Sequence, residues 1–244
     1  MLQRPHDELL KVVPLAAIVG QLTLSGDAFK RQLALGHSSY TLINPDLGFI
    51  TFVGLHDVLP DGGSGRFFWM MMRPDITIAD PGHWLQGASK QEKLNHVLKA
   101  AEKLPPKFRE IFELTPAEGI KEETHIWRDL ELPSLPAGRV VLMGDAAHAM
   151  TPFRGEGGYH TFLDALAFSK VLGRLNTDGK IRDTEAVKAA VDEYNAEMLE
   201  RGKKSVRFSR ESYEEAKKRA ENRQPFLAPM RPLAETDIVL EVKA

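Results

Sequence analysis

Cysteine is absent from the sequence of 244 residues. Its absence excludes disulfide bonds, thiolate metal sites and a cysteine nucleophile together. Also lacking is any apolar run that approaches the ~20 residues of a membrane-spanning helix. The first residues of the chain are too polar for a signal peptide. These absences predict a soluble, cytoplasmic protein.

An excess of charge of either sign is missing as well. The formal net charge is −2, and no basic cluster is interleaved with stacking aromatic residues, so we expect no nucleic-acid partner. No pair of histidines has the spacing of metal ligands, so we expect no metal site. The apolar fraction of 43% nevertheless suffices for a real core, in one large domain or in one and a half small ones.

The first part of the chain alternates short β-forming runs with turn residues. Four of these runs predict strands, at 15–24, 39–44, 49–58 and 66–72. Most of the connections are short, which favours an antiparallel meander, and the glycine-rich loop between the last two runs indicates a hairpin. A short helix before Gly36 and a fifth strand over 120–132 complete this part.

The run from Phe67 to Met72 is apolar on both of its faces. Such a strand is usually core on both sides. Alternatively, one of its two alternating rows lines a pocket for a flat hydrophobic substrate. The rows are Phe67, Trp69 and Met71, or Phe68, Met70 and Met72.

Helical signals follow the strands. Residues 89–92 form a capping box, and apolar residues at helical spacing continue until two prolines at 105–106 end the helix. A shorter helix carries Phe108 and Phe112. A long helical tail begins near Asp183, and we expect Gly202 to break or bend it.

The segment 139–175 combines a strand-like run, a turn and a helix. Residues 139–143 predict a buried strand that delivers Gly144 and Asp145 at its carboxyl end, where ligands bind in open α/β sheets. Pro152 and three glycines then precede a helix at about 159–175 that is apolar on most sides and is therefore expected to be largely buried. Its first N–H groups should face a crevice beside Asp145.

Residues 139–158, which read RVVLMGDAAHAMTPFRGEGG, resemble the second flavin fingerprint of the class A FAD-dependent monooxygenases. This family includes aromatic hydroxylases and tetracycline-inactivating oxygenases. The resemblance implies that Asp145 binds the ribityl chain of FAD and that Pro152 lies beside the isoalloxazine. It also implies that backbone amides at Gly155, Gly157 and Gly158 approach the pyrimidine edge of the ring, and that NAD(P)H supplies the electrons.

The sequence also departs from the family pattern. Glu156 stands where the family usually has Gln, and Tyr159 stands where it usually has Asn. The family holds the adenosine and pyrophosphate with an amino-terminal βαβ unit that carries Gly-x-Gly-x-x-Gly, and this motif does not occur in the sequence. We therefore expect a truncated homologue that binds FAD weakly or not at all by itself.

These observations predict an α+β fold with three parts. An antiparallel-rich mixed substrate-domain sheet with flanking helices occupies 1–135. The flavin-fingerprint strand, loop and helix, which form the carboxyl-terminal part of a flavin-binding α/β domain, occupy 136–180. A helical segment occupies 181–244.

Three functions stay open at this point. The first is an FAD-dependent monooxygenase part that acts on an aromatic or polyketide-like molecule of secondary metabolism, with a second chain supplying the nucleotide-binding half or with a homo-oligomer as its assembly. The second is a cofactor-independent isomerase, cyclase or lyase, which would use acid–base side chains at the mouth of the crevice. The third is a non-catalytic protein that binds a small molecule or a partner. The acid–base candidates are His160, Glu156, His148, Arg154 and Tyr159.

Overall fold

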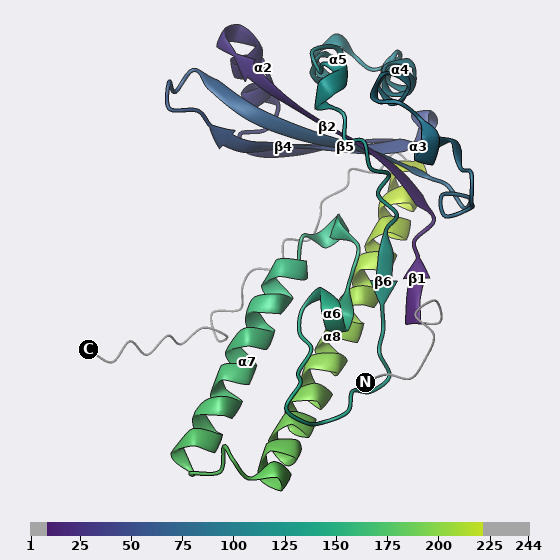
Figure 1. Cartoon of the computed structure of the whole chain (residues 1–244). Coiled ribbons are helices and arrows are strands. Elements are labelled where there is room, and N and C mark those ends of the chain that lie inside the picture. The colour runs from purple at the N-terminus through teal and green to yellow at the C-terminus, as the bar shows by residue number, and fades with distance from the viewer. Residues whose placement is uncertain (1–8, 222–244) are drawn as a thin grey trace.

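The computed structural model describes residues 9–221 (Figure 1). Its elements, in chain order, are β1 (Leu10–Val12), β2 (Leu15–Ser25), α2 (Gly26–Leu35), β3 (Ser39–Asn44), η1 (Pro45–Leu47), β4 (Phe49–Val58), β5 (Ser64–Pro74), α3 (Trp84–Gly87), α4 (Lys90–Ala101), α5 (Pro106–Glu113), η2 (Ala117–Gly119), β6 (Arg128–Leu130), α6 (Asp145–His148), η3 (Pro152–Arg154), α7 (Gly157–Thr177) and α8 (Thr184–Glu221).

The fold is α+β and consists of two bodies (Figure 1). The sheet body contains β2 to β5 with α2, α4 and α5 on one face. The helical body contains α6, α7 and α8, and α8 runs back to contact η1 and β3 of the sheet body. Among the described residues, none of the helices has the length and apolar character needed to cross a membrane.

The predicted antiparallel meander is confirmed for β3, β4 and β5, whereas β2 pairs with β5 and not with its sequence neighbour β3. Four strands pair antiparallel in the order β2-β5-β4-β3, and the hairpin between β4 and β5 contains the expected glycine-rich loop. The capping box at the start of α4 is also confirmed, since Ser89 and Glu92 exchange side-chain to backbone hydrogen bonds. The strand expected over 120–132 is confirmed only in part, because β6 covers three residues and pairs with β1.

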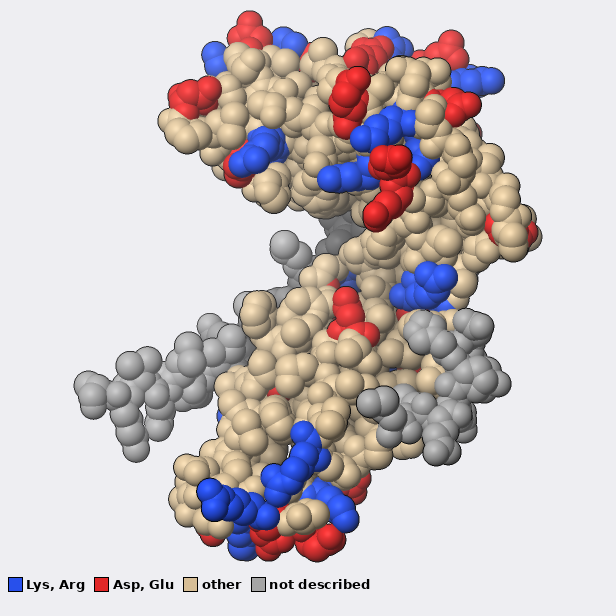
Figure 2. Space-filling view, in the orientation of Figure 1, with Lys and Arg blue, Asp and Glu red and all other residues tan. Residues whose placement is uncertain are grey.

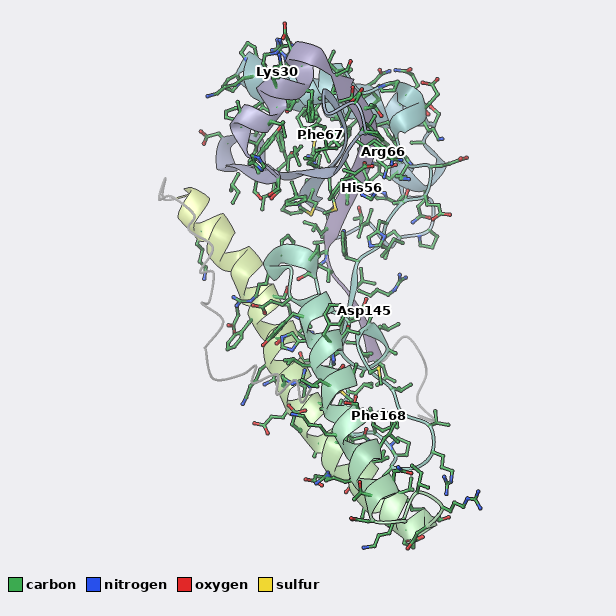
Figure 3. The ribbon with its side chains drawn as sticks, turned by 90° about the vertical axis from the view of Figure 1, so that its left-hand side faces the viewer. Lys30, His56, Arg66, Phe67, Asp145 and Phe168 are labelled. Atoms are coloured by element: carbon green, nitrogen blue, oxygen red, sulfur yellow. The ribbon has the colours of Figure 1, made fainter. Side chains whose placement is uncertain are left out.

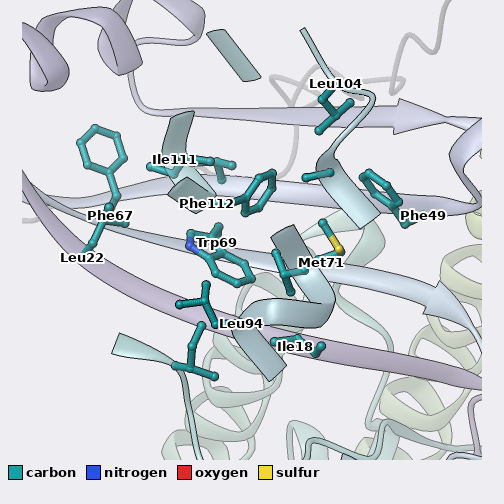
Figure 4. Close-up of a cluster of buried hydrophobic side chains, with 14 of the residues drawn as sticks. Ile18, Leu22, Phe49, Phe67, Trp69, Met71, Leu94, Leu104, Ile111 and Phe112 are labelled. Atoms are coloured by element: carbon teal, nitrogen blue, oxygen red, sulfur yellow. The ribbon is translucent and has the colours of Figure 1, made fainter. Parts of the chain in front are cut away.

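The first row of β5 belongs to the main core (Figure 4). Trp69 is fully buried, and its indole N–H donates to the Thr115 hydroxyl at 2.8 Å. Its ring meets Phe112 edge-on, with centroids 5.1 Å apart. A Cβ at Gly20 on the neighbouring strand would lie 2.3 Å from the Trp69 ring, so only glycine fits there. This row therefore serves packing against α4 and α5.

The second row of β5 lies on the opposite face of the sheet, which we call the open face. Its members and their cross-strand neighbours are Phe68, Met70, Met72, Val19, Ile50 and Phe52. Met72 is buried, whereas Met70 and Phe68 are half-buried. Phe153 of η3 packs against this face, so the open face looks toward the helical body.

The expected strand at 139–143 is wrong. The segment is irregular, and Val140 is 72% exposed. A β-forming run becomes a strand only when a neighbouring strand accepts and donates its backbone hydrogen bonds. No strand within residues 9–221 pairs with this segment.

The expectation that α7 is largely buried is also wrong. Phe162 is 76% exposed and Leu166 is 46% exposed. Only one stripe of the helix is buried, and it contains Asp164, Val171 and Leu175. This stripe packs on α8, and no other described helix or strand covers the opposite side.

Gly202 neither breaks nor bends α8 into two helices, which corrects the third expectation. The helix continues for 38 residues. A Cβ at Gly202 would lie 2.7 Å from the Cβ of His148 and 2.8 Å from its ring. Glycine is therefore required because α6 approaches the α8 backbone closely at this point, not because the helix ends.

Candidate functional site

The backbone turn at Gly144 determines where Asp145 lies. Gly144 has a φ of +58°, which strains any residue with a side chain, and a Cβ there would lie 2.7 Å from the Thr161 hydroxyl. Its N–H donates to the buried carboxylate of Asp164 at 2.7 Å. The turn consequently places Asp145 at the first residue of α6, at the surface of the helical body.

The Asp145 carboxylate is exposed, and no residue among 9–221 makes a hydrogen bond or ion pair with it. Its Oδ1 lies 4.0 Å from the position of a Cβ built on Gly157, so it stands beside the first turn of α7. Figure 3 shows Asp145 in the upper part of the helical body, nearer to the sheet than Phe168. Asp145 thus presents an unused hydrogen-bond acceptor to the surface.

The turn before α7 exposes backbone donors next to this acceptor. Pro152 is exposed, and Gly155 adopts a left-handed φ of +65°, which favours glycine. Gly157 and Gly158 occupy the first turn of α7, where backbone N–H groups have no intrahelical partner. The amino terminus of a helix also carries a partial positive charge. The five residues predicted to contact the flavin therefore lie together at one end of the helical body.

The surface between the two bodies is hollowed (Figure 2). Few Lys, Arg, Asp or Glu side chains appear there, whereas many appear over the sheet body and at the far end of the helical body. Phe153 links the two sides, because it belongs to η3 and packs against the open face. The apolar open face thus overhangs the segment that carries Pro152.

The buried carboxylate of Asp164 stabilises the turn at Gly144. It is fully buried and accepts hydrogen bonds from the Gly144 N–H, from His148 Nε2 at 2.8 Å and from Arg201 Nη2 at 2.8 Å. Burial raises the pKa of Asp164, but the three hydrogen bonds outweigh it and leave the pKa below its usual value. The ionised carboxylate therefore connects α6, α7 and α8.

His148 and His160 were expected at the mouth of the crevice, and this placement is wrong. His148 is buried between Asp164 and Gly202. His160 is also buried. Its Nε2 lies 2.6 Å from the Ser205 hydroxyl and its Nδ1 lies 3.2 Å from Arg201 Nη1. Burial, and then the charge of Arg201, lower the pKa of His160.

The other three acid–base candidates do lie near the turn. Arg154 and Glu156 form a two-pronged ion pair, with Nε to Oε2 at 3.0 Å and Nη2 to Oε1 at 2.7 Å. Tyr159 is 40% exposed, and its ring meets His160 edge-on. The ion pair fixes the loop before α7 and occupies both charged groups with each other.

Arg201 and Ser205 are the residues that sequence reasoning missed. Both lie on the stripe of α8 that faces α7, and they are spaced by one helical turn. The helical spacing of Tyr194 and Met198 on the same stripe is the signal in the sequence that pointed to this face, and both residues are buried. Asp164 lies on the helix that follows the fingerprint segment 139–158, and its role as an internal anchor was not predicted.

Residues 67–209 match the family model described as "FAD binding domain". An FAD-dependent monooxygenase, thnD of Trichoderma harzianum, is 61% identical over all 244 residues, which make up 60% of its own length. Another, cctM of Talaromyces islandicus, is 30% identical over 209 residues, which are 82% of this chain and 48% of that protein. The chain thus spans about half to three fifths of the length of these relatives.

Solved structures show the same fold. The 2,6-dihydroxypyridine-3-hydroxylase of Arthrobacter nicotinovorans superposes with a TM-score of 0.62 at 13% identity, over 91% of this chain and 55% of that chain. The tetracycline destructase Tet(51) superposes with a TM-score of 0.52 at 17% identity, over 89% and 51%. At these identities the likeness concerns the fold alone.

Proposed function

Since this chain belongs to the FAD-binding domain family, we propose that it forms the ring-binding and substrate-binding part of an FAD-dependent monooxygenase. The proposed substrate is an aromatic or polyketide-like small molecule of secondary metabolism, and the proposed electron donor is NAD(P)H. The relative from Trichoderma harzianum supports the monooxygenase activity. When bound, FAD would supply the oxygen-transfer chemistry, so the protein needs to bind and orient rather than to react.

The observation that carries the proposal is the state of the Asp145 carboxylate. It is exposed, unpartnered among residues 9–221, and 4.0 Å from the Cβ position at Gly157. A carboxylate accepts hydrogen bonds and donates none, so it suits the hydroxyl groups of a ribityl chain. The residues present therefore fit the cofactor that the family implies.

The neighbouring residues have complementary roles in this proposal. Pro152 gives a flat, exposed surface beside the ring. Gly157 and Gly158 bring backbone N–H groups to its electron-rich pyrimidine edge, where they donate hydrogen bonds without side chains in the way. The Gly155 N–H donates to the Pro152 carbonyl, so Gly155 shapes the turn that presents these donors. The partial positive charge at the start of α7 stabilises negative charge on that edge.

The open face of the sheet is the proposed substrate wall. Phe68, Met70 and Phe52 project from it, and the Phe52 and Phe68 rings lie 5.6 Å apart. Aromatic and thioether side chains adapt to flat, irregular ring systems. An apolar wall also excludes water from the space between the two bodies.

The exposed side of α7 is the proposed contact for the remaining nucleotide-binding part. Phe162, Leu166 and Leu172 are exposed on this helix, although such side chains are normally buried. In the proposal, a second chain that holds the adenosine and pyrophosphate covers this side, or a further copy of this chain does so.

Neither alternative function has an observation in its favour. Proton transfer by His160 would need a ring nitrogen that faces a substrate, but both nitrogens contact Ser205 and Arg201. His160 therefore acts as a positioning residue between α7 and α8. A purely non-catalytic role in binding another molecule predicts that flavin binding has no special dependence on Asp145.

The proposal is tested by comparing riboflavin, FMN and FAD in titrations that follow flavin fluorescence. If this chain binds only the ring and the ribityl group, which all three flavins share, the three flavins should bind weakly and with similar affinity. Asp145→Ala should weaken all three by about tenfold, the loss expected for one or two hydrogen bonds to a charged group. Asp178→Ala, which removes an exposed carboxylate at the far end of α7, is the matched control.

Two results would contradict the proposal. One is equal flavin binding by the wild type and Asp145→Ala. The other is FAD binding that is at least a hundredfold tighter than riboflavin binding, because this chain would then hold the nucleotide as well. Turnover of a candidate substrate that continues without flavin and without oxygen would exclude the monooxygenase reaction itself.

A further inference from the structure

A second cavity lies on the helix-covered face of the sheet, beneath α3 and α4. Its volume is about 530 Å³. Ile18, Phe49 and Met71, which Figure 4 labels, line it from the sheet. They lie on the face opposite to Met70 and Phe153. The cavity is thus separated from the Asp145 turn by the thickness of the sheet, and the proposed flavin contacts do not use it.

Two rings stand in the wall of this cavity. Trp84 and His96 both line it, and their ring centroids lie 4.7 Å apart. Trp84 is 44% exposed, which is unusual for the largest apolar side chain. The apolar floor and the exposed indole give the cavity the character of a site for a flat ring.

The cationic group at this cavity is Arg73, an exposed residue of β5 in the same row as Met71. Its Nη1 lies 3.0 Å from His96 Nε2. A guanidinium only donates hydrogen bonds, so His96 Nε2 accepts and the ring is neutral. Burial, and then the charges of Arg73 and Lys99, lower the pKa of His96, which agrees with a neutral ring.

Nothing in the described chain balances the charge of Arg73. No carboxylate among residues 9–221 forms an ion pair with it. Asp75 also lines the cavity, but its carboxylate already accepts hydrogen bonds from Thr77 at 2.7 Å and contacts His83 Nε2 at 3.1 Å. The cavity therefore combines an apolar interior with one guanidinium whose charge lacks a partner.

We propose that this cavity binds a small planar aromatic carboxylate, with its ring against Trp84 and Met71 and its carboxylate on Arg73. A planar guanidinium matches a carboxylate with two parallel hydrogen bonds. The volume lies within the range of about 300–1,000 Å³ that is typical of small-molecule sites. The ligand class is that of one or two fused rings bearing a single acid group.

The probe for the test is 2-naphthoate, titrated into the full-chain protein and followed by calorimetry and by the ¹⁵N–¹H signals of the indole groups. The sequence has three tryptophans, which serve as internal controls for one another. We expect the Trp84 signal to shift, because only Trp84 lines the cavity, and those of Trp69 and Trp127 to stay in place. Shifts confined to Trp127, which packs on the open face, would overturn the assignment.

The charge requirement is tested separately. Arg73→Gln should weaken 2-naphthoate binding by about 10- to 100-fold, which is the loss expected for hydrogen bonds to a charged group. Arg66→Gln is the matched control, since it removes the same charge from the same strand but from a residue paired with Asp57. The neutral 2-naphthamide should bind the wild type at least tenfold more weakly than the acid.

Three outcomes would overturn the inference. They are the absence of 2-naphthoate binding up to its solubility limit, equal binding of the acid and the amide, and equal effects of Arg73→Gln and Arg66→Gln. Ala100→Phe gives an independent readout, because Ala100 lines the cavity and a larger side chain there should abolish binding by filling it. Unchanged binding in a folded Ala100→Phe variant would also overturn the site.

Discussion

Replacing Gly202 with alanine tests whether the site segment depends on the close contact between α6 and α8. In an open helix the substitution would stabilise the protein by about 1 kcal/mol, because alanine has the higher helix propensity. At Gly202 the new Cβ would lie 2.7 Å from the Cβ of His148. The contact is with the first atom of a side chain, next to the backbone, so α6 and α8 have to separate.

The magnitude follows from two opposing effects. Overpacking of a well-packed contact costs about 1–3 kcal/mol, and the absence of a flexible neighbouring atom favours the upper part of this range. Subtracting the gain in propensity leaves a net loss of about 1–2 kcal/mol for Gly202→Ala. For a chain of this size the melting temperature should fall by about 2–8 °C.

Gly173 provides the matched control. It lies within α7, and a Cβ built on it meets nothing within 4 Å. Gly173→Ala should therefore raise the melting temperature by about 2–4 °C, since it gains helix propensity without a clash. Calorimetry on both variants gives shifts of opposite sign. A Gly202→Ala variant that melts at or above the wild type would refute the close contact.

Two further predictions concern the same body. Asp164→Ala should lower the free energy of unfolding by about 3–5 kcal/mol at neutral pH, because it leaves the buried Gly144 N–H and His148 Nε2 without their acceptor and removes one of the two carboxylates paired with Arg201. The pKa of Asp164 is lower in the folded protein than in the unfolded chain. Its carboxylate therefore stabilises the fold fully above the unfolded pKa of about 3.9, and this stabilisation is lost as the pH falls through the folded pKa. In urea unfolding at acidic pH, the free energy of unfolding of the wild type should approach that of Asp164→Ala. Phe162→Ser should change stability by less than about 0.5 kcal/mol, whereas Val171→Ser, on the buried stripe of the same helix, should cost about 2 kcal/mol or more. Equal losses in these two variants would contradict the orientation of α7.

Local chemistry explains which parts of the fold could be predicted. The start of α4 depends on Ser89 and Glu92, which contact each other directly, so the sequence contains both partners within four residues. The strands of the meander likewise show their pattern in consecutive residues. The alternation along β5 showed which residues share a face of the strand. It did not show which face packs against helices, because that depends on α4 and α5, which follow later in the chain.

Long-range contacts explain the failures. Residues 139–143 have the composition of a strand, but strand formation depends on partners elsewhere. Gly202 has the low propensity of a helix breaker, but its meaning comes from His148, which lies far away in the sequence. His160 was expected to be exposed because it follows glycines, and only the position of Arg201 and Ser205 on α8 shows that it is enclosed.

Asp145 and Asp164 have opposite environments, and this contrast explains how the turn can present a free acceptor. Asp145 has no partner among residues 9–221, so nothing it contacts fixes its position. Asp164 accepts the Gly144 N–H, and Gly144 is the residue immediately before Asp145. The buried carboxylate of Asp164 therefore fixes the backbone that orients the exposed carboxylate of Asp145. A ligand that binds Asp145 does not have to displace an internal hydrogen bond. Loss of Asp145 should consequently affect ligand binding without affecting stability, whereas loss of Asp164 should affect stability first and ligand binding as its result.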